Sequence, residues 1–138
     1  MNSLFPDICS DALPESRDFY VSLLGFKPVF EMDWYIQLQA PNDENVQLAF
    51  VARDHPSVPE GYRVTPQGVV ITVELNDIEP VHRRALQMGV TLIQELRDEV
   101  WGQRHFMAAD PNGLLVDVVQ MIAPAPEFAE QYTQAQPV

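Results

Sequence analysis

Apolar and polar residues follow the same order twice along the chain. Residues 13–26 (LPESRDFYVSLLGF) and 78–90 (IEPVHRRALQMGV) place apolar side chains at helical spacing, with proline in the first turn and glycine near the end. Strand patterns precede these predicted helices at 4–10 and 69–75, and three more follow each helix: 27–32, 34–40 and 46–52, then 92–96, 104–109 and 114–120. The pattern predicts two βαβββ units and an internal duplication.

The stretch from Asp110 to Gln120 (DPNGLLVDVVQ) joins a predicted tight turn to an apolar strand. Proline presets φ at the second turn position, asparagine and glycine tolerate a left-handed backbone, and aspartate bonds the backbone two residues on. The strand is apolar on both faces, so Asp117 is predicted to point into an interior or a cavity, where an unpaired charge is costly. A similar stretch begins at Ala40 and places Gln47 where the second copy has Asp117.

These elements predict an α+β protein with four parts. Residues 1–52 form the first βαβββ module, and 68–121 form the second. Residues 53–67 contain three prolines and a glycine in a mostly polar run, which is typical of a linker. Residues 122–138 are Pro-rich and lack an extended apolar pattern, so we expect a surface-lying or partly disordered tail.

Charge and composition narrow the classes of partner. A formal net charge of −12 and a pI near 4.3 oppose binding to nucleic acid or to anionic lipid and favour a cationic small molecule, although acidic residues also serve solubility. No apolar run reaches the length of a membrane span and no signal peptide is evident, which predicts a cytoplasmic protein. The single Cys9 excludes an intramolecular disulfide and a zinc site of several thiolates.

Two motifs in the second half connect this pattern to a known family. A WG-x-R at 101–104 and a DPNG-x-x-x-D at 110–117 follow the two βαβββ patterns. Together they resemble the vicinal oxygen chelate superfamily, which includes glyoxalase I, extradiol dioxygenases and bleomycin-resistance proteins. The resemblance covers about residues 4–120. It implies paired modules whose curled mixed sheets enclose a cleft, commonly in a homodimer.

The resemblance also indicates where a metal would bind. Metal-dependent members take ligands from the first and last strands of each module, and those positions here are Phe5, Gln47, Val70 and Asp117. Phe5 and Val70 have no donor atom, and an open catalytic site needs about three protein ligands. We therefore expect no metal and no other cofactor. The alternative is a divalent cation held by Asp7, Glu74 and Asp117, which strand alternation puts on matching faces.

Aromatic residues complete the candidate cleft. Trp34 and Tyr35 offer surfaces for a planar or cationic group, and His105 follows the WG-x-R motif. The resemblance gives Trp101 a place in an apolar ligand cleft, although plain packing is an equal alternative. The predicted cleft residues are Phe5, Asp7, Trp34, Gln47, Val70, Glu74, Trp101, His105 and Asp117.

Three functions remain open at this point. The favoured one is metal-free sequestration of a small organic molecule, cationic and aromatic in character, as in bleomycin resistance. The second is a metal-dependent lyase or dioxygenase of the glyoxalase type with an unusual ligand set. The third is a subunit with a vestigial cleft, and fold alone does not choose among them. Whether the chain is an enzyme is therefore left open.

Overall fold

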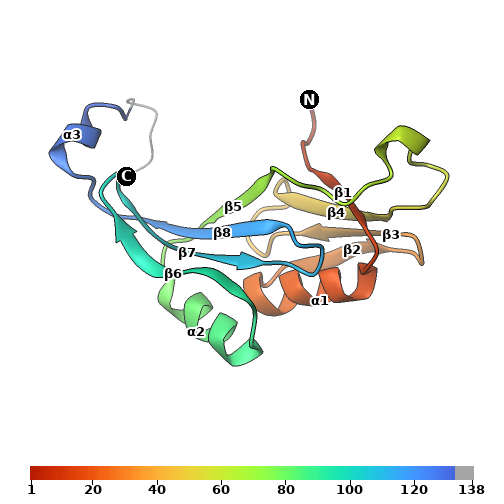
Figure 1. The fold of residues 1–138 in the computed structure, drawn as a ribbon, viewed down its shortest axis with the longest axis horizontal. Helices are drawn as coiled ribbons and strands as arrows, with labels where there is room; N and C mark the ends of the chain where they lie inside the picture. The colour runs from red at the N-terminus through yellow and green to blue at the C-terminus, as the bar shows by residue number, and fades with distance from the viewer. Residues whose placement is uncertain (133–138) are drawn as a thin grey trace. The chain divides into compact units, whose positions relative to one another are not determined.

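The computed structural model describes residues 1–132 and divides into two units, each an α+β module (Figure 1). Unit 1 comprises Met1–Val69 and Asp110–Leu114, and unit 2 comprises Val70–Ala109 and the described residues from Leu115 onward. Each unit contains a four-stranded mixed sheet and a helix in the order βαβββ. The predicted fold class and duplication are confirmed.

Unit 1 contains the first sheet. Its elements are β1 (Asp7–Ser10), α1 (Leu13–Leu24), β2 (Lys27–Glu31), β3 (Tyr35–Gln39), β4 (Gln47–Ala52) and the single 3₁₀ turn η1 (Glu60–Tyr62). The strand order is β1-β4-β3-β2, with β1 parallel to β4 and the other pairs antiparallel. The helix therefore provides the crossover between the edge strands β1 and β2.

Unit 2 repeats this plan. It contains β5 (Val70–Glu74), α2 (Glu79–Met88), β6 (Leu92–Glu99), β7 (Gln103–Ala109), β8 (Leu115–Met121) and the short α3 (Pro126–Ala129). The strand order is β5-β8-β7-β6, again with one parallel pair, β5 with β8. The edge strands β2 and β6 both have register shifts, β2 against β3 and β6 against β7. The two sheets therefore share irregularities as well as strand order.

Both long helices end in the same way. Gly25 and Gly89 adopt φ of +73° and +69°, a left-handed conformation that side chains with a Cβ rarely take. The next residue then donates its backbone N–H back into the last turn, from Phe26 to Tyr20 and from Val90 to Ala85. The glycines that mark the helix ends in the sequence thus turn the chain into β2 and toward β6.

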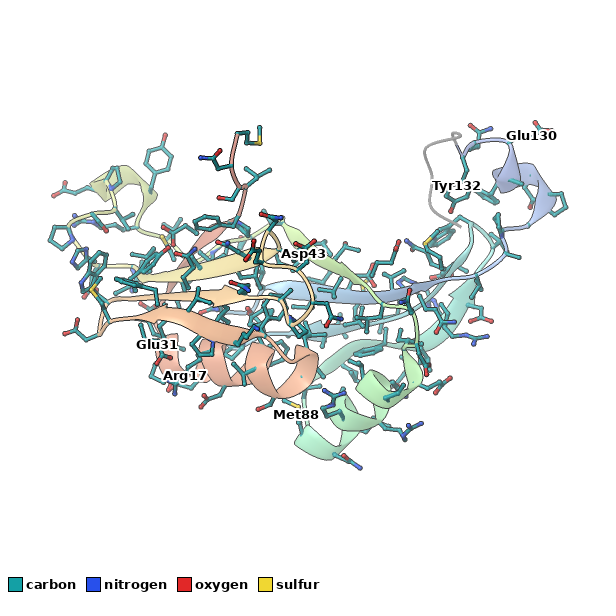
Figure 2. The ribbon with its side chains drawn as sticks, turned by 180° about the vertical axis from the view of Figure 1, so that it is seen from behind. Arg17, Glu31, Asp43, Met88, Glu130 and Tyr132 are labelled. Carbon is teal, nitrogen blue, oxygen red and sulfur yellow. The ribbon has the colours of Figure 1, made fainter. Side chains whose placement is uncertain are left out.

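The core of unit 1 lies between α1 and one face of its sheet. Tyr20 and Leu23 are fully buried, and their partners across the layer include Leu38 and Phe50. The rings of Tyr20 and Phe50 lie 5.5 Å apart. At the exposed side, Arg17 on α1 and Glu31 on β2 form an ion pair (Figure 2). Burial of this helix stripe leaves the opposite face of the sheet for other contacts.

Some boundaries differ from the sequence predictions. β1 begins at Asp7 instead of Leu4, because Pro6 has no N–H to donate to a sheet ladder and only its carbonyl bonds Ala49. Residues 53–67, expected as a linker, are grouped with unit 1. The C-terminal segment contains the one-turn α3, which the absence of an apolar pattern did not predict. The rest of the expected tail, 133–138, lies outside the described residues.

No helix within residues 1–132 combines the length and the hydropathy needed to cross a membrane.

The turn at Asp110–Leu114 is part of unit 1 and is held by a buried hydrogen-bond network. The Asp110 carboxylate accepts the backbone N–H groups of Asn112 (2.8 Å) and Leu114 (2.9 Å), and the hydroxyl of Tyr20 on α1 (2.9 Å). The Asn112 side chain donates to Ser16 and accepts from Ser10. Burial, and then the neighbouring Asp110, raise the pKa of Tyr20, so its hydroxyl stays protonated as a donor.

We expect Tyr20→Phe to lower the free energy of unfolding by about 1–3 kcal/mol, because it leaves a buried carboxylate oxygen without its hydroxyl donor. Urea denaturation followed by circular dichroism measures this change. Tyr62→Phe is the matched control, since Tyr62 is exposed. Equal losses in the two variants would contradict the assignment of the Tyr20 bond as a stabilising contact.

Candidate functional site

One face of the first sheet points away from α1 and carries polar side chains. Cross-strand register aligns Asp7 and Gln37 with Ala49, and Tyr35 with Val51. Because side chains alternate along a strand, these residues share one face, and the apolar residues between them pack on the helix. The polar side chains of the first sheet that could contact a ligand therefore lie on this face.

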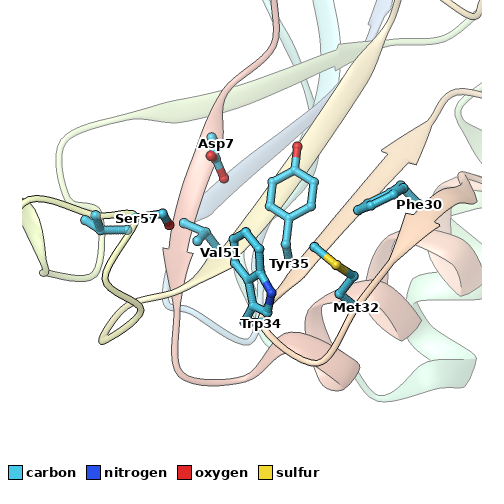
Figure 3. Close-up of a pocket in the computed structure, with 8 residues that line it drawn as sticks. Asp7, Phe30, Met32, Trp34, Tyr35, Val51 and Ser57 are labelled. Atoms are coloured by element: carbon cyan, nitrogen blue, oxygen red, sulfur yellow. The ribbon is translucent and has the colours of Figure 1, made fainter.

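A pocket of about 370 Å³ lies on this face (Figure 3). This volume falls within the range of small-molecule sites, roughly 300–1,000 Å³. The lining residues come from β1 to β4, the β2–β3 connection and the loop after β4, and they are Asp7, Phe30, Met32, Trp34, Tyr35, Val51, Ser57 and Val58. Three are aromatic and one is acidic, and none carries a positive charge. The pocket therefore suits an apolar, flat molecule with a cationic or hydrogen-bond-donating group.

Asp7 supplies the charge of the pocket. Partial burial raises the pKa of its carboxyl group. The nearby Tyr35 hydroxyl also has a raised pKa, first because of burial and then because of the Asp7 charge. In Figure 3 the Asp7 carboxylate and the Tyr35 hydroxyl lie toward the same side of the pocket. Asp7 remains exposed to solvent, and a cation bound there would favour the charged form of its carboxylate.

Gln47 is engaged elsewhere on this face. The Tyr35 hydroxyl donates to Gln37 Oε1 (2.9 Å), and Gln37 Nε2 donates to Gln47 Oε1 (2.6 Å). Gln47 Nε2 in turn donates to the Glu44 carbonyl (2.7 Å). Its amide oxygen, the only atom that could coordinate a metal, already accepts a hydrogen bond. Gln47 thus supports Tyr35 through Gln37 and does not line the pocket.

Trp34 also contacts an aromatic side chain that does not line the pocket. The ring of His55 is stacked on its indole, with centroids 3.8 Å apart and an interplanar angle of 4°. His55 lies in the loop after β4, which also contributes Ser57 and Val58 to the lining. No pattern in the sequence predicted this contact, because the prolines around His55 are typical of a linker.

The second sheet carries a separate polar cluster in unit 2. His105 on β7 is buried, and its two ring nitrogens are bonded to different carboxylates. Nδ1 lies 2.8 Å from Asp117 Oδ1 on β8, and Nε2 lies 2.8 Å from Glu99 Oε2 on β6. Gln94 Nε2 is also 3.0 Å from Nε2. The buried acid that the sequence predicted at Asp117 thus has an imidazole partner on the neighbouring strand.

The charge state of this cluster follows from its bonds. Burial lowers the pKa of His105, but hydrogen bonds to Glu99 and Asp117 raise it by more, so the net direction is upward. The hydrogen bond from His105, followed by the one from Arg97, lowers the pKa of Glu99. A protonated ring can donate from both nitrogens at once. The three hydrogen-bonded side chains are therefore best described as carboxylate–imidazolium–carboxylate.

This geometry does not suit a single metal ion. The two nitrogens of an imidazole point to opposite sides of the ring, so the carboxylates that they bond cannot converge with one of them on a common centre. Among the described residues, no three His, Cys, Asp or Glu side chains are arranged to hold an ion. The residues present therefore do not fit the metal that the fold family suggests.

The remaining predicted residues are not among the residues that line the pocket. Phe5 precedes β1 and is half-buried. Val70 and Glu74 are exposed on the edge strand β5, and the residue aligned with Asp117 is Thr72, not Val70. Trp101 lies between β6 and β7, where it donates to Gln103 and meets the His105 ring edge-on. The structure thus brings Asp7 with Trp34, and separately His105 with Asp117 and Trp101.

Some members of these two clusters were not among the predicted cleft residues. Phe30, Met32, Val51, Ser57 and Val58 line the pocket, Glu99 accepts from His105, and the Gln94 amide lies beside the same ring nitrogen. The apolar ones carry no chemical signature in the sequence, and Ser57 lies in the expected linker. Glu99 lies beyond the predicted end of its strand, since β6 extends to residue 99.

Comparison with known proteins identifies the family. The model of the Glyoxalase/Bleomycin resistance protein/Dioxygenase superfamily matches residues 5–118, and the chain belongs to this superfamily. An uncharacterised protein of Mycobacterium bovis is 27% identical over 124 residues, which cover 80% of this chain and 78% of that protein.

Solved structures share the fold at low sequence identity. TnmS3, an antibiotic-binding protein from a Streptomyces species, has a TM-score of 0.67 and 21% identity over 88% of this chain and 96% of its own. A bleomycin resistance determinant encoded on the transposon Tn5 has a TM-score of 0.61 and 22% identity over 88% and 98%. Proteins with this fold thus include an antibiotic-binding protein and a bleomycin resistance determinant.

We expect the stability contributed by the His105 cluster to peak in mildly acidic solution. The raised folded pKa of His105 means that its contribution is full below about pH 6.5 and is lost as pH rises through the folded value. The lowered pKa of Glu99 means that its contribution is present above about pH 4.3 and is lost as pH falls.

Denaturant unfolding of the wild type and His105→Gln across this range measures the effect. The difference in free energy of unfolding should be largest between about pH 5 and 6.5 and should shrink in alkaline solution. His82→Gln is the matched control, because the Nε2 of His82 has no hydrogen-bond partner within the described residues. A difference that grows as pH rises would contradict the imidazolium assignment.

Proposed function

We propose that this protein binds a planar, cationic organic molecule in the unit 1 pocket and releases it unchanged, without a catalytic metal. The observation that carries the proposal is the composition of the pocket. It combines Trp34, Tyr35 and Phe30 with one carboxylate, Asp7, and no basic side chain. Aromatic faces attract cations, and the overall charge of −12 favours their approach.

The alternative of a metal-dependent enzyme is less well supported by the residues. Asp117 is bonded to His105, Gln47 accepts from Gln37, and the remaining family positions, Phe5 and Val70, offer no donor atoms. Antibiotic-binding relatives with the same fold are consistent with sequestration. We therefore propose recognition, not bond-breaking, as the role of this face of the sheet.

Titration calorimetry with proflavine, a flat monocationic dye, tests the proposal. We expect the wild type to bind the dye and Trp34→Ala to weaken binding by about 2- to 30-fold, which corresponds to 0.5–2 kcal/mol for a cation–π contact. Trp101→Ala is the matched comparison, and a smaller effect is expected because Trp101 is not among the lining residues. Catechol and a glutathione thiohemiacetal serve as enzyme substrates, and their conversion on addition of zinc, nickel or iron would overturn the proposal.

We also propose that the protein is a homodimer. The edge strand β2 is exposed along its whole length and presents Val29 and Phe30, and the edge strand β6 presents Ile93. Open sheet edges with apolar side chains are commonly covered by a partner, and a symmetric dimer is the most frequent arrangement. Sedimentation equilibrium at micromolar concentration should give about twice 15.6 kDa. A mass of one chain that does not change with concentration would contradict the dimer.

A further inference from the structure

The loop after β4 is part of unit 1 and is held by several hydrogen bonds. Arg53 Nε bonds both carboxylate oxygens of Asp11, at 3.0 and 3.1 Å, and its Nη1 donates to the Arg63 carbonyl. Arg63 Nε donates to the Val58 carbonyl at 2.7 Å. Two backbone bonds, from His55 to Ala52 and from Val58 to His55, close successive turns. A loop with this many internal bonds can present a side chain in a fixed position.

The ring of His55 is fixed within that loop. Its Nδ1 accepts the backbone N–H of Ser57 at 3.1 Å and lies 2.9 Å from the Ser57 hydroxyl. These contacts set the plane of the imidazole, which stacks on Trp34 at 3.8 Å with only 4° between the rings. His55 does not line the pocket, whereas Trp34 and Ser57 do. His55 thus contacts the pocket through its neighbours and not directly.

The backbone of Trp34 is held as well. Its carbonyl accepts the N–H of Ala52 at 2.8 Å, at the start of β3 beside β4. The indole lies against the tilted Tyr35 ring, with centroids 5.8 Å apart, and the stacked imidazole of His55 covers one of its faces, which restricts rotation about the side-chain torsions. The rest of the indole forms a wall of the pocket. Preorganised aromatic walls bind flat ligands with less loss of conformational entropy.

We infer that His55 is a positioning residue, which holds the Trp34 ring so that a flat aromatic ligand can stack on it inside the pocket. The inference rests on the proposed function and deepens it, because it names the residue that orients the indole for a planar ring system. A small, nearly spherical cation such as choline can contact Asp7 and an aromatic face in many orientations, so its binding depends less on an indole held in one orientation. Ring planarity, in addition to charge, becomes the basis of selection.

Proflavine binding in a Trp101→Phe background tests the inference, because Trp34 is then the only tryptophan. We expect His55→Ala to weaken binding by about 3- to 10-fold and His55→Phe, which can stack again, to restore affinity to within about twofold. Without dye, the fluorescence anisotropy of Trp34 should fall in His55→Ala and recover in His55→Phe. Choline affinity should change by less than about twofold in all variants.

His82→Ala is the matched control, since His82 packs on Phe106 in unit 2. Circular dichroism and urea unfolding establish that each variant is folded. Equal proflavine affinity and equal anisotropy in the wild type and His55→Ala would overturn this inference alone. A wild type that binds no proflavine would overturn the proposed function and the inference with it, and a failure of His55→Phe to rescue a weakened His55→Ala would overturn stacking as the cause.

Discussion

Unit 1 depends most on the hydrogen bonds that the buried Asp110 carboxylate accepts. A turn carboxylate that receives two backbone N–H groups and the Tyr20 hydroxyl fixes the turn in place on α1. The same turn leads into β8, the strand that contains Asp117. Each donor offsets part of the cost of burying a charge, and the loss of any one leaves that cost uncompensated.

The acidic side chains of the two sheets have different partners. In unit 2, Asp117 and Glu99 share the imidazolium of His105, so the cluster carries its own cation. In unit 1, Asp7 lines a pocket with no basic group among its lining residues, so we propose that its cationic partner is a ligand. The first arrangement stabilises a sheet, and the second suits recognition. Net acidity alone, which the sequence shows, does not distinguish these two uses of a carboxylate.

Local signals predicted the fold well. Helix periodicity, the terminal glycines Gly25 and Gly89, and the Asp110 turn each act within a few residues, so the sequence carries them directly. The burial of Asp117 was also predictable, from the apolar residues around it. Its partner was not, because the choice of His105 depends on cross-strand register between β7 and β8. His55 and Trp34 lie in two different loops, and the periodicity of apolar residues does not predict a contact between loops.

The central claim is that the Asp7 carboxylate selects a cationic flat ligand in the unit 1 pocket. The most direct measurement is calorimetry of N-methylquinolinium and its neutral isostere methylnaphthalene against the wild type and Asp7→Asn, with Asp98→Asn as the matched control. The account predicts that the wild type and the control prefer the cation by about 5- to 30-fold, and that Asp7→Asn loses most of this preference. A preference that is absent from the wild type, or unchanged in Asp7→Asn, would contradict it.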